Sequence, residues 1–151
     1  MHPSMQRIHD DVAKFGWHVV AVKVDGTTED KFAFTVGLFE TYEHPELVIV
    51  GLQMNAAHGI LSTCVAKIEE GKRFEDGQSR SDILNRFTAA VVAVDKSFYE
   101  EYLGSAIGFY DGTDFPALQI VWPDRNNLLP WQPGYDQASL GSQTVLAITA
   151  A

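Results

Sequence analysis

The spacing of hydrophobic residues predicts three helices. Apolar side chains recur every three or four positions over residues 4–16, which predicts an amphipathic helix that Gly16 ends. The clearest helical pattern covers residues 56–70, with Asn55 as its expected N-cap. A further helix is expected to begin at Ser97, which starts a Ser-x-x-Glu capping-box pattern.

Between these helices the sequence predicts several strands. They are expected over residues 17–24, 31–38, 46–52, 86–94 and 116–122. In the strand 31–38, large residues alternate with small ones, so one face is a core face and the other carries only small groups. A helix or a neighbouring strand is the usual cover for such a face, and a ligand pocket is the alternative. Residues 79–85 are polar and match no pattern.

The order and spacing of these elements favour one mixed domain. Short connections between the first three strands favour antiparallel pairing, because parallel strands need a long crossover. No repeat, linker or charge block divides the chain. We therefore predict a single domain over residues 1–151 of the α+β class, with a mostly antiparallel sheet or a split-barrel-like β core and two to three helices.

Charge narrows the classes of partner. The chain has 11 Lys+Arg against 20 Asp+Glu, a formal net charge of −9 at pH 7. Nucleic acids and anionic membrane surfaces are therefore not expected as partners, because proteins bind them by neutralising phosphates with Lys and Arg. No apolar run is long enough to span a membrane. The last 15 residues, 137–151, carry no charge at all.

The single cysteine, Cys64, excludes an intramolecular disulfide and is expected in the core of the helix 56–70. The first residues run into an amphipathic stretch rather than into a signal-peptide pattern. A cytoplasmic location is therefore expected.

Three residues form the main candidate for catalysis. His44 and Glu46 flank the start of the strand 46–52, and His58 lies near the start of the following helix. An imidazole beside a carboxylate suits general acid–base chemistry, because the carboxylate orients the ring and raises its basicity. The alternative is structural: His44 shapes a turn and His58 borders the core. Their spacing matches no metal-binding pattern, so no metal site is predicted.

A second candidate concerns ligand or cofactor binding. Thr35 and Gly37 lie on the small-residue face of the strand 31–38, where a ligand can approach the backbone. Asn55 marks a helix N-terminus, which attracts phosphate or carboxylate groups. The chain has neither a Gly-x-Gly-x-x-Gly motif nor a P-loop.

Several sequence blocks resemble one bacterial family, domain of unknown function 4262. They are the segments 34–42, 44–49, 71–77, 116–125 and Pro130-Trp131, and together they extend the resemblance over residues 14–136. The chain departs from the family pattern at Asn127, where a Gly is usual, although Asn also tolerates a left-handed turn. The resemblance implies no established activity or catalytic residue.

The order of the segments 35–38, 45–48 and 56–70 is also similar to that of flavin-reductase-like split barrels. By this analogy alone, a flavin is a candidate cofactor. Fold does not determine function, so the analogy concerns architecture.

Two functions remain open from the sequence. In the first, the protein binds a small molecule near the strand 31–38, and it is an enzyme if the His/Glu cluster acts on that molecule. In the second, it is a non-catalytic acidic interaction protein, for instance of the immunity type, whose negative charge faces a basic partner. A homodimer is compatible with either function.

Overall fold

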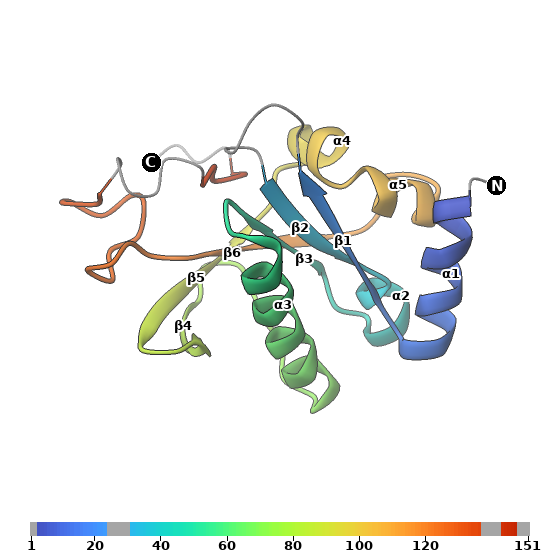
Figure 1. Cartoon of the computed structure of the whole chain (residues 1–151), viewed down its shortest axis with the longest axis horizontal. Helices are drawn as coiled ribbons and strands as arrows, with labels where there is room; N and C mark the ends of the chain where they lie inside the picture. The colour runs from blue at the N-terminus through green and yellow to red at the C-terminus, as the bar shows by residue number, and fades with distance from the viewer. Residues whose placement is uncertain (1–2, 24–30, 137–142, 148–151) are drawn as a thin grey trace.

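One six-stranded sheet with helices on both faces forms the fold (Figure 1). The computed structural model describes residues 3–23, 31–136 and 143–147. Its elements, in chain order, are α1 (Pro3–Phe15), β1 (His18–Lys23), β2 (Lys31–Val36), α2 (Leu38–Tyr42), β3 (Glu46–Val50), α3 (Met54–Glu69), β4 (Ser79–Leu84), β5 (Phe87–Ala93), the 3-10 helix η1 (Lys96–Phe98), α4 (Tyr99–Tyr102), α5 (Gly104–Tyr110) and β6 (Ala117–Val121). The α+β prediction is confirmed, although the described residues contain five α-helices instead of two to three.

The strand order in the sheet is β1-β2-β3-β6-β5-β4. β1 pairs antiparallel with β2, and β2 with β3, as their short connections predict. The central pair, β3 and β6, is parallel, whereas β5 pairs antiparallel with both β6 and β4. The sheet is open, with β1 and β4 at its edges. Of the two expected forms, the mostly antiparallel sheet is therefore the one observed.

Each face of the sheet has its own hydrophobic core. On one face, α3 buries Leu61, Cys64 and Val65 against strand residues that include Leu47 and Ile120. Burial raises the pKa of the Cys64 thiol to about 12, so this cysteine is an inert core residue, as expected.

The opposite face is covered by α1, α4 and α5, which pack on Phe34, Val36 and Val48. Among the described residues, no helix is long and apolar enough to cross a membrane.

The small-residue face of β2 lies under α3. Ala33 and Thr35 on this face are 1% and 0% exposed, and Ala33 belongs to the core that α3 completes. Small side chains are needed there because α3 lies close to the strand. The prediction of a covering helix is confirmed, and the prediction of a ligand pocket over this face is wrong.

Two predicted helix caps are wrong. α3 begins at Met54 with Gln53 as its N-cap, so Asn55 lies inside the first turn. The helix starts earlier than the polar side chain of Asn55 suggests, because the chain already turns at Gly51, whose φ is +95°. Likewise Asp95, rather than Ser97, is the cap of η1, and its carboxylate accepts a hydrogen bond from the Ser97 N–H.

The polar segment that matched no pattern forms the edge strand β4, paired with β5 from Ser79 opposite Ala90. Charged side chains on an edge strand discourage pairing with other chains, which explains the absence of an apolar signal. The uncharged stretch 137–151 is described only over residues 143–147. There Leu146 is fully buried, and its N–H donates to the Gln119 side chain on β6 at 2.7 Å.

We predict that Gly37→Ala lowers the free energy of unfolding by about 3 kcal/mol, measured by urea denaturation. Gly37 has φ +108°, and an added Cβ would lie 2.8 Å from Val12 Cγ2 and 3.1 Å from the Gly16 carbonyl oxygen. Gly71→Ala is the matched control: its φ of +95° imposes similar backbone strain, but no atom lies within 4 Å of the new Cβ. We expect the control to lose only about 1 kcal/mol. Equal losses would show that packing against α1 contributes nothing.

Candidate functional site

Glu46, the first residue of β3, is fully buried and surrounded by hydrogen-bond donors. The Thr35 hydroxyl donates to Glu46 Oε1 at 2.7 Å, and the Tyr110 hydroxyl donates to Oε2. The backbone N–H groups of residues 37, 38 and 39 donate at 3.0, 3.2 and 3.1 Å. Five donors therefore converge on one carboxyl group.

This arrangement follows from how the chain begins α2. Gly37 is the N-cap of that helix and offers no side chain, so the free N–H groups of its first turn need another acceptor. The Glu46 carboxylate takes this role from the neighbouring strand, at the positive end of the helix. The Thr35 hydroxyl also accepts the Leu47 N–H at 2.9 Å, which commits its own hydrogen to Glu46.

The network is satisfied only when Glu46 is ionised, because all five contacts donate to it. Burial raises the pKa of Glu46, and the hydrogen bonds from Tyr110, Thr35 and the backbone oppose that rise. Burial and the adjacent carboxylate also raise the pKa of Tyr110, so its hydroxyl keeps the proton that it donates. The Glu46 carboxylate is thus a structural clamp with no exposed surface for a ligand.

His44 is also fully buried, and both of its ring nitrogens are engaged. The Phe74 N–H donates to Nε2 at 2.9 Å, so the hydrogen is on Nδ1, which donates to the Pro45 carbonyl oxygen at 2.8 Å. Burial, with a smaller effect from the positive charge of Arg73, lowers the pKa of His44. The ring is therefore neutral and connects the turn before β3 to the loop 71–78.

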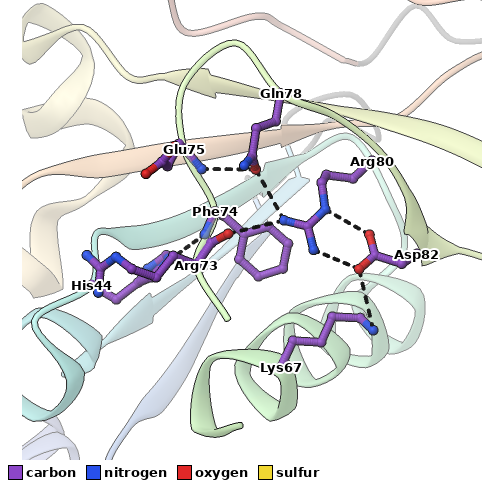
Figure 2. Close-up of polar contacts among 8 residues, drawn as sticks. All are labelled: His44, Lys67, Arg73, Phe74, Glu75, Gln78, Arg80 and Asp82. Carbon is purple, nitrogen blue, oxygen red and sulfur yellow. Dashed lines mark hydrogen bonds and ion pairs between the residues drawn. The ribbon is translucent and has the colours of Figure 1, made fainter. Parts of the chain in front are cut away.

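Figure 2 shows that Arg80 on β4 holds the other side of this loop. Its guanidinium lies over the Phe74 ring, 4.4 Å from the centroid, and donates to the Arg73 carbonyl oxygen at 3.2 Å. Two further bonds, of 2.9 and 2.7 Å, join it to the Asp82 carboxylate, which Lys67 of α3 approaches to 3.6 Å. The hydrogen bonds from Arg80 lower the pKa of Asp82 to about 2. This cluster fixes the loop against the sheet.

The remaining predicted site residues do not line one common cavity. Thr35 and Gly37 use their polar hydrogens on Glu46, and Asn55 is exposed in the first turn of α3. His58 is exposed on α3, where its Nδ1 lies 3.4 Å from Ser62 Oγ. The structure brings Glu46, Thr35 and Gly37 together, but as a buried network, and it does not bring His58 to them.

His58 instead lines a surface groove of about 720 Å³ along the edge strand β1. The groove lies between α1, β1 and the start of α3, and Ser105 of α5 reaches it as well. Its chemically distinctive lining residues are Arg7, Asp11, Phe15, Trp17, His18 and His58. The Trp17 and His58 rings lie at one side, with their centroids 6.4 Å apart.

Asp11 and His18 form an ion-pair-type contact on the wall of this groove. Asp11 Oδ2 lies 2.6 Å from His18 Nδ1, and the two side chains are 31% and 19% exposed. The ring nitrogen Nε2 has no hydrogen-bond partner among the described residues. A carboxylate that engages one imidazole nitrogen leaves the other available for acid–base chemistry.

Sequence reasoning missed this pair. Asp11 belongs to a helix and His18 to a strand, and their separation of seven residues matches no catalytic motif. The only available signal was a histidine at the start of an otherwise apolar strand. Within the residues that the structure describes, no group of three or more His, Cys, Asp or Glu is arranged to hold a metal ion.

A family model described as "Domain of unknown function (DUF4262)" matches residues 11–136. The chain therefore belongs to this family, as its sequence blocks indicated. Neither a curated protein nor a solved structure matches it. The matched residues include Asp11, His18 and His58, whereas Arg7 lies just outside them.

We predict that Glu46→Gln lowers the free energy of unfolding by about 3 kcal/mol at pH 7. A glutamine amide presents its own N–H groups to donors that need an acceptor. The matched control is Glu40→Gln, which removes an exposed charge from the first turn of α2, the helix whose N–H groups Glu46 accepts, and is expected to cost less than about 1 kcal/mol. Denaturant unfolding measures both. If Glu46→Gln left the free energy of unfolding almost unchanged, the buried carboxyl group would be protonated in the folded protein.

We predict that His44 makes the folded state less stable as the pH falls. Its folded pKa is lowered, so from about pH 6.5 downward the unfolded chain takes up a proton that the folded chain refuses. Stability therefore falls from about pH 7 toward pH 5, by at most about 1.4 kcal/mol per pH unit.

The readout is the dependence of urea midpoints on pH in wild type, His44→Gln and His58→Gln. We expect His44→Gln to be less stable throughout and to have a flatter pH dependence, whereas the exposed-site control keeps the wild-type slope. A wild-type slope in His44→Gln would contradict the role assigned to this ring.

Proposed function

We propose that this DUF4262-family protein binds a small molecule in the groove along β1, and that His18 transfers a proton to or from that molecule. The observation that carries the proposal is the 2.6 Å contact between Asp11 Oδ2 and His18 Nδ1 on the groove wall. The pair replaces the His44–Glu46 cluster as the candidate for acid–base chemistry, because both of those side chains are fully buried.

The chemistry of the pair supports this role. The Asp11 carboxylate accepts the hydrogen on Nδ1, so the neutral His18 ring carries its lone pair on Nε2. The same contact fixes the orientation of the ring. A general base needs a free lone pair within reach of its substrate, and Nε2 has no competing partner among the described residues.

The shape and lining of the groove support small-molecule binding. Its volume of about 720 Å³ lies within the range of about 300–1,000 Å³ typical of ligand sites. The lining combines apolar and aromatic side chains, such as Ile8, Phe15 and Trp17, with a few polar groups. Such a lining lets the apolar part provide affinity while the polar groups orient the ligand.

Hydrolysis of p-nitrophenyl acetate tests the proton-transfer role. His18 Nε2 takes a proton from the water that attacks the ester carbon, the C–O bond breaks and p-nitrophenolate leaves. We expect His18→Gln to lower the rate at least tenfold, and Asp11→Asn to lower it several-fold, because the ring loses its orienting carboxylate.

His9→Gln is the matched control, since it removes an imidazole from α1 outside the groove and should keep the rate within about twofold of wild type. Circular dichroism and the urea midpoint confirm that each variant is folded. A His18→Gln variant that is folded and as fast as wild type would overturn the proton-transfer role.

A further inference from the structure

The β1 groove does not share the negative charge of the whole protein. The chain carries a formal net charge of −9. The groove, in contrast, is lined by one cation, Arg7, and one acid, Asp11, so its formal charge is zero when His18 and His58 are counted as neutral, as they are in the net charge of the chain. That acid is already engaged by His18. An anion in the groove therefore meets no excess of acidic groups, and Arg7 offers it a cationic partner.

Arg7 carries the positive charge of the groove lining. It lies on α1 one turn before Asp11, a spacing that places both side chains on one face of the helix. The Asp11 carboxylate is engaged with His18 of β1. Arg7 has no hydrogen-bond or ion-pair partner in the part of the chain that the structure describes. Its guanidinium, which forms bidentate contacts with carboxylates, is thus available to a ligand.

The apolar part of the groove favours a flat ring. Phe15 is 58% exposed, which is unusual for a large aromatic residue, and it follows Asp11 by one further helical turn. Trp17 and His58 add two more rings, inclined by 35°. Aromatic faces and edges of this kind favour a planar partner over a branched aliphatic one.

We propose that the groove binds a planar aromatic carboxylate, with Arg7 holding the carboxylate and Phe15, Trp17 and His58 contacting the ring. The inference rests on the proposed function, because it names the class of ligand for the same groove. In this arrangement Arg7 determines specificity, and the Asp11–His18 pair lies beside the bound ligand. The ligand anion takes the place of the carboxylate partner that Arg7 lacks among the described residues.

Three small probes separate the two features of the ligand. Benzoate has both the ring and the charge, benzamide keeps the ring without the charge, and acetate keeps the charge without the ring. Dissociation constants come from titrations followed by two-dimensional NMR of the ¹⁵N-labelled protein, with the Trp17 indole and the residue 58 amide as reporters. We expect benzamide and acetate each to bind at least tenfold more weakly than benzoate.

Arg7→Gln should weaken benzoate binding at least tenfold and leave benzamide binding unchanged. Lys72→Gln is the matched control, because it makes the same change in net charge at an exposed loop position away from the groove. Equal effects of the two substitutions would overturn the role of Arg7. Benzamide binding as tight as benzoate would overturn the preference for an anion.

A wider set of neutral and cationic fragments distinguishes this inference from the proposal on which it depends. If such fragments shift the groove signals and benzoate does not, small-molecule binding stands and the anionic class is wrong. If every fragment instead shifts signals at the separate groove near Trp131, or if none shifts any signal, both are wrong.

Discussion

The buried carboxylate of Glu46 joins parts of the chain that are far apart in sequence. It is the first residue of β3, and it accepts hydrogen bonds from β2, from the start of α2 and from Tyr110 at the end of α5. A charge without partners in this position would cost more than a small domain can tolerate. With five donors, the same charge determines where α2 begins and how α5 docks on the sheet.

A second buried group has a similar role on the other side of the turn. His44 uses both ring nitrogens to connect this turn to the loop 71–78, which Arg80 and Phe74 hold against the sheet (Figure 2). Because helices cover both faces of the sheet, little polar surface remains in its centre. Accessible polar chemistry is therefore found at the edge, where β1 meets α1 and α3 (Figure 1).

The two edge strands of the sheet, β1 and β4, use their polar side chains differently. β4 carries charged residues, and its pairing with β5 shifts register between Arg80 and Leu84. β1 is regular over its six pairs with β2, and Val19 and Val20 line the groove beside His18. Polar side chains on β4 serve packing and edge protection. At the β1 edge, His18 of the strand and Asp11 of α1 form the candidate site.

The sequence by itself determined the fold class, the helix α3 with its buried Cys64, and the antiparallel order of the first three strands, because periodicity and loop length are local properties. It also indicated the family and marked His44 and Glu46 as unusual residues. Only the tertiary structure decided that these two are buried clamps and that Asp11 meets His18. Such contacts depend on how separate elements pack against one another, and the spacing of residues along the sequence does not encode the distance between two elements. The same holds for Arg7: its charge is visible in the sequence, but only the structure shows that Asp11 contacts His18 and that no described residue pairs with Arg7.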